Sequence, residues 1–258
     1  MCARFSCVYD KTIFTYRFSK QISVQYDVII VGGGAVGLAT ALQLKKQNPK
    51  LKIVVIEKES VVANHQTGNN SNVIHSGVYY KPGSLKAKNC IEGYNLLLDF
   101  IRTYEIPHNL CGKVIVATEE SEIPYLKTIY ERGQANGLTN LKMLTAAGVK
   151  EYEPHVAAVA GIHVPQTGIV DYRVVAEKYA EVFQQQGGEL RLGEKVIDIQ
   201  LGSNNAVVVT QKSSYTGKLV VNCAGLYSDK IAKLTLGDKV DLKIIPFRGE
   251  YYKLKKEK

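Results

Sequence analysis

The chain has 258 residues, of which 45% are hydrophobic and 22% are charged, and this balance excludes a wholly disordered protein. The formal net charge of +9 would suit an anionic cofactor or substrate. The basic residues are scattered, so nucleic acid is not an expected partner. No apolar run is long enough to span a bilayer, although a peripheral membrane association stays open.

The cysteines indicate the redox environment. There are five of them, an odd number, and their spacings match no metal motif, so we expect free thiols in a reducing compartment and no metal site. The first 25 residues are basic and almost free of acids. That stretch is expected to be a mitochondrial-type leader, a disordered tail or an extended start. The expected location is cytoplasmic, or mitochondrial in a eukaryotic host.

The ordered chain is predicted to begin with a βαβ unit. Residues 26–31 are mostly β-branched and apolar, which is typical of a strand buried on both faces of a parallel sheet. A cluster of three glycines follows, and residues 35–47, rich in Ala and Leu, predict a helix. Residues 51–56 predict the second buried strand, which is closed by Glu57. A strand, a helix and a strand in this order indicate a nucleotide-binding half-sheet.

A long polar loop over residues 60–84 follows, and loops of this length inside a domain are usually functional. Beyond it the pattern predicts helices and strands in alternation. The expected helices span 85–104, 123–136, 172–186 and 227–236. The expected strands span 114–117, 161–164, 168–170, 189–192, 195–201, 206–211, 218–222 and 244–254, with a hairpin between 195–201 and 206–211.

The glycine cluster forms the motif Gly32-x-Gly34-x-x-Gly37, placed between a buried strand and a helix. Gly32 permits a tight turn, Gly34 allows the backbone to approach a pyrophosphate, and Gly37 allows close packing of the helix on the strand. The helix N-terminus would then offer free N–H groups to phosphates. A glycine-rich turn without a ligand is the plain alternative.

Glu57 ends the second strand, 20 residues after Gly37. A carboxylate there can accept both hydroxyls of a ribose, which favours FAD or NAD over a cofactor with a 2′-phosphate. FAD is preferred because the motif opens the ordered chain and a second strand ends late, in Ala224-Gly225. That second turn resembles the second FAD-contacting turn of flavoprotein oxidoreductases. An ordinary strand-to-helix turn is its alternative.

The long loop carries the most specific pattern, which runs from His65-Gln66-Thr67 through His75-Ser76-Gly77 to Lys86-Ala87. It resembles the glycine-oxidase and D-amino-acid-oxidase superfamily, and within it the L-2-hydroxyglutarate dehydrogenase/oxidase family. Stretches that agree with the same family begin at Cys111, His163, Cys223 and Pro246, so the resemblance covers residues 26–254. The family's chain continues past position 258, so the resemblance predicts an incomplete substrate domain here.

Two positions of the loop depart from the family pattern. Asn69 stands where the family usually has His, and Asn72 where it usually has Gly. The glycine position is expected to need a positive φ, which Asn tolerates better than other side chains.

The resemblance implies an α/β fold, with a Rossmann-like FAD-binding domain and an interleaved mixed-sheet α+β substrate domain. The FAD-binding domain, a parallel sheet flanked by helices, is expected from residues 26–98 and 166–240. The substrate domain is expected from 99–165 and 241–258. The flavin would lie between the two.

The implied reaction is FAD-dependent oxidation of L-2-hydroxyglutarate to 2-oxoglutarate. His75 is the expected catalytic base, since a neutral histidine has a suitable pKa, with covalent flavin attachment as its rival role and His163 as second candidate. Arg248 is the expected carboxylate partner, and Tyr79 and Tyr80 are expected to wall the site. The further expected FAD contacts, besides the three glycines, Glu57, Ala224 and Gly225, are Lys58, Thr67, Asn70, Ser71 and Val196.

Several alternatives stay open at this point. The chain could oxidise another hydroxy or amino acid, glycerol 3-phosphate or malate, because the fold alone does not distinguish these substrates. It could also be an inactive fragment. The electron acceptor is oxygen, a quinone or an electron-transfer protein. For Asp171 the preferred interpretation is a helix cap before Tyr172.

Overall fold

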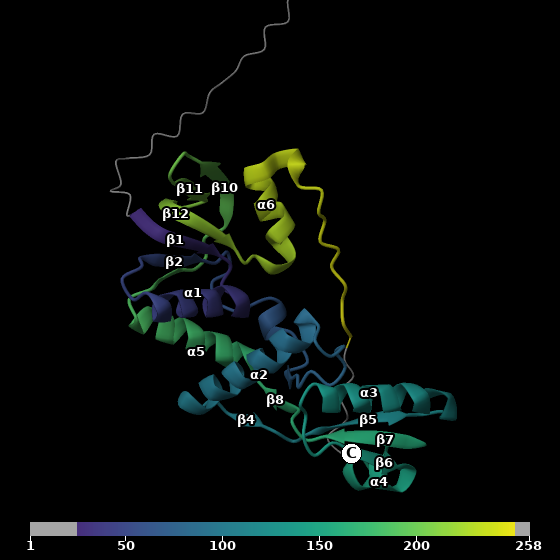
Figure 1. Ribbon diagram of the computed structural model, residues 1–258. Coiled ribbons are helices and arrows are strands. Elements are labelled where there is room, and N and C mark those ends of the chain that lie inside the picture. The colour runs from purple at the N-terminus through teal and green to yellow at the C-terminus, as the bar shows by residue number, and fades with distance from the viewer. Residues whose placement is uncertain (1–24, 251–258) are drawn as a thin grey trace, which may run out of the picture.

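A computed structural model describes residues 25–250 of the chain. The leader or tail predicted for residues 1–25 lies outside the described residues, apart from Gln25, which begins the first strand. The described part contains one six-stranded sheet and two three-stranded sheets (Figure 1).

The six-stranded sheet has the order β10-β11-β12-β1-β2-β9. Its parallel part pairs β1 (Gln25–Val31) with β2 (Ile53–Ile56) and with the late strand β12 (Ser214–Asn222), and β2 with β9 (Glu189–Arg191). The strands β10 (Val196–Leu201) and β11 (Ala206–Thr210) extend it antiparallel, which confirms the predicted hairpin. The sheet is therefore mixed, whereas a parallel one was expected.

Helices cover both faces of this sheet. Alternate residues of β1 and β2 face α1 (Ala35–Gln47) and α5 (Tyr172–Gln185), where Leu38, Ala41 and Phe183 are fully buried. The other set of alternate residues packs with Ile231 and Leu234 of α6 (Ser228–Leu236). Both faces of β1 and β2 are apolar because both are covered, as the continuous apolar runs predicted.

A second region links this sheet to the rest of the molecule. The helix α2 (Leu85–Thr103), capped by the Ser84 hydroxyl, shares a core with the small sheet β3-β8-β4. These strands are short: β3 is Val73–Ile74, β4 is His108–Asn109 and β8 is Gly168–Val170. The Asp171 carboxylate accepts a hydrogen bond from Arg173 N at 2.8 Å, so the predicted cap of α5 is confirmed.

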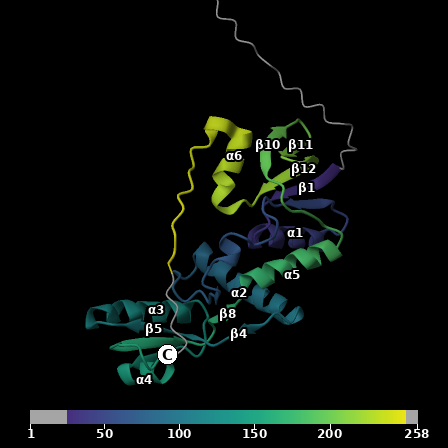
Figure 2. The same cartoon turned by 180° about the vertical axis from the view of Figure 1, so that it is seen from behind.

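The third region is the antiparallel sheet β5-β7-β6, which lies at the far end of the molecule from the six-stranded sheet (Figure 2). Helix α3 (Ile123–Ala135) packs on it through Leu126 and Ile129. The remaining elements here are β5 (Lys113–Ala117), β6 (Lys142–Thr145), α4 (Ala146–Tyr152) and β7 (Ala160–Val164).

The end of the described chain differs from the prediction. A strand was expected over residues 244–254, but residues 244–250 form none, and 251–254 lie outside the described residues. The segment instead runs as an extended chain from α6 toward the β5-β7-β6 region (Figures 1 and 2). Phe247 is 92% exposed there, because no neighbouring strand pairs with the segment to bury its alternating apolar side chains.

Candidate functional site: a glycine turn with a ribose-type carboxylate

The glycine turn between β1 and α1 leaves no room for side chains. Gly32 has a φ of +116°, and a Cβ added to it would lie 2.3 Å from the Cys223 carbonyl oxygen. A Cβ on Gly37 would lie 2.0 Å from the Gly32 carbonyl oxygen. Both contacts are with backbone atoms, which cannot move aside. The turn therefore needs glycine at these two positions, as the motif predicted.

The N-terminus of α1 is capped from the long loop. Gly34 at the cap position has no side chain to offer, and Thr67 Oγ1 accepts the hydrogen bond from Ala35 N at 3.0 Å. The loop around Thr67 is in turn held by Asn70, whose amide donates to the carbonyls of Gln66 and Thr67 at 3.2 and 2.7 Å. Thr67 thus joins the start of the signature loop to the glycine turn.

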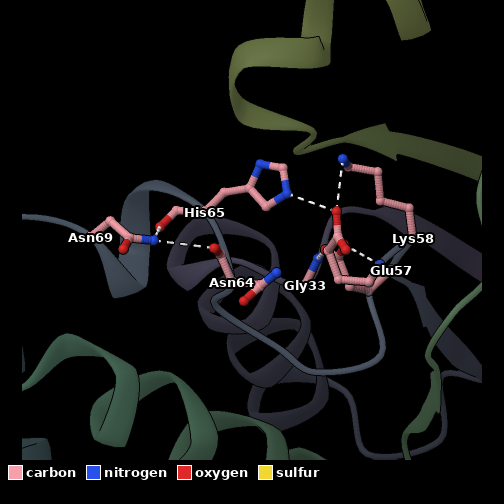
Figure 3. Close-up of polar contacts among 7 residues, drawn as sticks. Gly33, Glu57, Lys58, Asn64, His65 and Asn69 are labelled. Atoms are coloured by element: carbon pink, nitrogen blue, oxygen red, sulfur yellow. Dashed lines mark hydrogen bonds and ion pairs between the residues drawn. The ribbon is translucent and has the colours of Figure 1, made fainter. Parts of the chain in front are cut away.

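The side chain of Glu57, which follows β2, is fixed by two hydrogen bonds. Its Oε2 accepts a hydrogen bond from Gly33 N at 2.7 Å, and its Oε1 accepts one from Glu59 N at 2.9 Å (Figure 3). Two backbone donors fix the carboxylate beside the glycine turn. Each oxygen keeps a lone pair for another donor, such as a ribose hydroxyl.

Charged and aromatic groups surround this edge of the sheet. Glu59 Oε1 lies 2.9 Å from both Lys58 Nζ and His65 Nε2, and these two partners lower the pKa of Glu59 to about 2. The centroid of the Tyr227 ring lies 4.3 Å from Lys58 Nζ and 4.9 Å from Lys230 Nζ. The rim is therefore cationic and aromatic, which suits phosphates and a stacked base.

A cavity of about 700 Å³ lies over the glycine turn, within the usual range for ligand sites. The predicted residues that line it are Gly32, Gly34, Glu57, Lys58, Thr67, Val196, Ala224 and Gly225. Gly37 does not line it, but allows α1 to pack on the turn. Asn70 shapes the loop, and Ser71 is exposed and outside the lining. The tight turn, the fixed carboxylate and the cationic rim fit the adenosine diphosphate half of FAD.

Some lining residues were not predicted. Glu194 is buried, and its carboxylate accepts hydrogen bonds from the hydroxyls of Thr210 and Tyr215, both at 2.8 Å. Burial and the Glu194 carboxylate raise the pKa of Tyr215. The sequence also did not predict Tyr227 and Lys230 as site residues. Tyr227 precedes α6 and Lys230 lies on it, and the sequence of α6 shows only an ordinary amphipathic pattern.

His75 lies outside this cavity, in a second cluster. It follows β3, and its carbonyl accepts a hydrogen bond from the Cys90 thiol of α2 at 3.5 Å. Partial burial of the ring, and then the positive charge of Lys113, lower the pKa of His75. The lowered pKa favours the neutral form of the imidazole, which can accept a proton.

The predicted substrate residues are divided between two places. The Tyr79 hydroxyl accepts a hydrogen bond from Lys113 Nζ at 3.2 Å, and Tyr80 follows in the same turn. Arg248 is far more exposed, at 89% of its side chain, and its nearest acid is Glu250 at 4.0 Å. Tyr79 therefore lies in the same cluster as His75, through Lys113. Among the described residues, Arg248 contacts neither Tyr79 nor His75.

The remaining histidine candidate, His163, lies on β7. Its ring stacks on Tyr152 with centroids 4.3 Å apart, and its Nδ1 is buried without a hydrogen-bond partner in the described part of the chain. Burial and the nearby Lys142 lower its pKa. Within residues 25–250 no three metal-ligating side chains gather, and no helix there is long and apolar enough to cross a membrane.

The chain is similar to several curated proteins. It is 56% identical over 235 residues to "L-2-hydroxyglutarate dehydrogenase" of Indibacter alkaliphilus, with 91% of this chain and 59% of the relative covered. It is 44% identical over 245 residues to the mitochondrial protein of that name from Homo sapiens, with 90% and 53% covered. The chain thus spans somewhat more than half the length of these relatives. The expected resemblance is confirmed.

Solved structures agree with the fold. The FAD-bound L-alpha-glycerophosphate oxidase of Mycoplasma pneumoniae matches with a TM-score of 0.76 and 30% identity, over 82% of this chain and 57% of that one. Glycine oxidase from Geobacillus kaustophilus matches with a TM-score of 0.72 at 22% identity, over 81% and 58%. The predicted α/β fold class is confirmed.

The glycine turn, the Glu57 carboxylate and the late turn at Ala224 and Gly225 meet at one cavity, as the two-turn FAD pattern requires. The model of the DAO family, described as FAD dependent oxidoreductase, matches residues 27–258. The chain therefore belongs to the DAO family of FAD-dependent oxidoreductases.

Proposed function

We propose that this chain binds FAD with its adenosine end in the cavity over the glycine turn. The observation that carries the proposal is the carboxylate of Glu57, which two backbone N–H groups hold beside that turn. Glu57 would accept the ribose hydroxyls, and Gly32 and Gly34 would let the backbone approach the pyrophosphate. Lys58 and Lys230 would add positive charge at the rim, and Thr67, Val196, Ala224 and Gly225 would complete the walls.

We further propose that the substrate is L-2-hydroxyglutarate and the product 2-oxoglutarate. Support comes from the names of relatives at 56% and 44% identity. When bound, FAD supplies a two-electron acceptor for the substrate C–H bond. His75, kept neutral by partial burial and by Lys113, would receive the hydroxyl proton. Tyr79 and Tyr80 would line the same region, and the exposed Arg248 would reach the substrate only by moving.

The division into an FAD-binding domain from 26–98 and 166–240 and a substrate domain from 99–165 and 241–258 is part of this proposal. The electron acceptor stays open between oxygen, a quinone and an electron-transfer protein. A mitochondrial location in a eukaryotic host is proposed from the names of relatives such as the one from Nematostella vectensis.

A second candidate is oxidation of glycerol 3-phosphate. It is favoured by the similarity, at a TM-score of 0.76 and 30% identity, to a protein named L-alpha-glycerophosphate oxidase. Both candidates are anionic 2-hydroxy compounds, so both would suit the cationic surroundings of His75.

The purified chain tests these proposals through its visible absorption spectrum. We expect a flavin spectrum that L-2-hydroxyglutarate bleaches without oxygen, and that D-2-hydroxyglutarate and glycerol 3-phosphate leave unchanged. Bleaching by glycerol 3-phosphate alone would replace the proposed substrate with the second candidate. A folded chain that takes up no FAD would contradict the cofactor proposal for this polypeptide.

A further inference from the structure

Within residues 25–250, Lys113 at the start of β5 is a partly buried cation without an acidic partner. Its Nζ donates a hydrogen bond to the Tyr79 hydroxyl at 3.2 Å and lies 4.2 Å from the centroid of the Tyr79 ring. Across residues 25–250, every ion pair within 4.0 Å involves other groups, so no carboxylate neutralises Lys113. Burial lowers the pKa of Lys113, which shows that the protein does little to stabilise its charge.

An ammonium group in this position is costly unless an anion joins it. Removing a charge from water without a partner destabilises the folded protein, and a phenol and an aromatic ring compensate only in part. Among residues 25–250, the groups whose pKa responds to Lys113 are His75 after β3, whose pKa is lowered by burial and by Lys113, and Cys90 on α2, whose pKa is raised because burial outweighs Lys113; neither supplies a negative charge. A bound carboxylate would supply the missing charge.

The backbone fixes Lys113 and His75 relative to each other. Gly112, next to Lys113, donates its N–H to the Thr167 carbonyl at 2.8 Å. The buried hydroxyl of Thr167 lies 3.3 Å from that of Ser76, the neighbour of His75. Thr167 therefore ties together the two segments that carry the amine and the imidazole.

The turn that carries Tyr79 is fixed independently by the end of α3. Asn136 donates its amide to the carbonyls of Gly77 and Tyr80 at 3.1 and 2.9 Å, and Arg132 donates to the Tyr79 carbonyl at 3.2 Å. The ring of Tyr79 is thereby held under Lys113. A site whose members are positioned in advance loses less entropy when it binds a ligand.

We propose that Lys113 binds a carboxylate of the hydroxy-acid substrate and holds the substrate hydroxyl against His75. This inference rests on the proposed function and deepens it, since it assigns the carboxylate contact to a residue of β5 in place of Arg248. The positive charge of Lys113 also lowers the pKa of the imidazole of His75.

The test uses glutarate, a dicarboxylate that carries no hydroxyl and cannot be oxidised at C2. Its affinity for the FAD-loaded chain is measured by calorimetry for wild type, Lys113→Met and Lys113→Arg. Lys142→Met on β6 is the matched control, since it removes an exposed lysine of the same sheet. We expect Lys113→Met to weaken glutarate binding by about 10- to 100-fold, the usual value of a charge-assisted hydrogen bond, with partial recovery in Lys113→Arg.

Circular dichroism and flavin content establish that each variant is folded. Equal glutarate affinity in folded wild type and Lys113→Met, or no glutarate binding by wild type, would overturn the inference. With L-2-hydroxyglutarate, Lys113→Met should raise KM more than it lowers kcat and should move the acidic limb of the pH profile upward, because His75 regains a more ordinary pKa. A wild type that binds glutarate through Lys113 but is not reduced by the L isomer would overturn only the proposed function.

Discussion

The cavity over the glycine turn and the cluster around Lys113 handle charge in opposite ways. At the cavity, Glu57 is held by two backbone N–H groups, and Glu59 already pairs with Lys58 and His65. At the cluster, an amine faces a phenol, a thiol and a neutral imidazole. In the first region the carboxylates of Glu57 and Glu59 already have donors from the chain before any ligand binds, whereas in the second region the amine gains an opposite charge only with an anion.

The difference indicates separate tasks for the two regions. A prosthetic cofactor is retained through many turnovers, so a site built from fixed backbone suits it. A substrate must enter and leave in each cycle, so a site that gains a compensating charge only while the substrate is present suits selective binding of anions. Variants on each side should therefore affect different measurements, and the following predictions are arranged by expected size.

The largest effect is expected from His75→Asn. Removing a general base typically slows the chemical step by about 10²- to 10⁴-fold, whereas flavin content should stay at the wild-type level because His75 lies outside the cavity. Stopped-flow reduction by L-2-hydroxyglutarate measures the step. In wild type, burial and Lys113 lower the pKa of His75, so the base should stay neutral to a lower pH than an ordinary histidine and the acidic limb of the activity profile should lie lower than in a variant without Lys113. A variant with unchanged rate, or an unchanged pH profile, would remove His75 from this role.

Glu57→Gln should weaken the binding of FAD, which His75→Asn leaves unchanged. The amide keeps the shape but cannot accept as strongly from ribose hydroxyls, so FAD affinity is expected to drop by about 10- to 100-fold. Fluorescence titration of the flavin-free protein with FAD measures this. Glu92→Gln, on the exposed side of α2, is the control with the same chemical change. Equal FAD affinity in both variants would contradict the assignment of Glu57.

Gly37→Ala tests the packing of the turn itself. The new methyl group would meet the Gly32 carbonyl at 2.0 Å, so the variant should be destabilised by about 1–3 kcal/mol and should lose flavin. Gly93→Ala in α2 is the matched control, because a Cβ there meets no atom within 4 Å. Urea unfolding should show that the control is equal to wild type or more stable by up to about 1 kcal/mol. Equal stability in the two variants would show that the turn tolerates a side chain.

The smallest effect is expected at Asn72, which has a φ of +59°. Asn72→Gly should stabilise the protein by at most about 1 kcal/mol, because glycine adopts this conformation without strain but has more entropy to lose. Asn72→Val should destabilise it by about 1–2 kcal/mol. Urea midpoints of the two variants measure the difference, and the opposite order would show that the loop relaxes to a negative φ.

Local patterns predicted the cofactor region well. Helices cover both faces of the sheet, so nearly every residue of β1 and β2 is apolar and the pattern can be recognised in the sequence. The glycines between the two strands mark the turn. The positive φ expected at position 72 is confirmed, since a family position reserved for glycine marks a backbone requirement. The departure at Asn69 is also explained by the structure, because its amide donates to the carbonyls of Asn64 and His65 and holds the loop.

The parts of the molecule outside the six-stranded sheet were predicted less well, because their sequence patterns are short or depend on residues far apart in the chain. The strands β3 and β4 have two residues each, and α4 has seven, too few for a period to show. The alternation over residues 244–250 predicted a strand, but a strand also needs a partner, and none pairs with it in the described chain. Lys113 lies within a stretch noted for family resemblance, yet only tertiary structure brings its charge near enough to lower the pKa of His75.

The parallel pairing of β1 with β12 has a consequence for biosynthesis. Val28 aligns with Leu219, and the Gly32 turn packs against Cys223, so the nucleotide cavity is closed by residues separated by most of the chain. Pairings of such long range form late and slowly. On the ribosome, the first strand and its glycine turn must wait for residues beyond 220 to emerge. During that interval the apolar faces of β1 and β2 are exposed, so chaperones that shield them should set the yield of FAD-loaded protein.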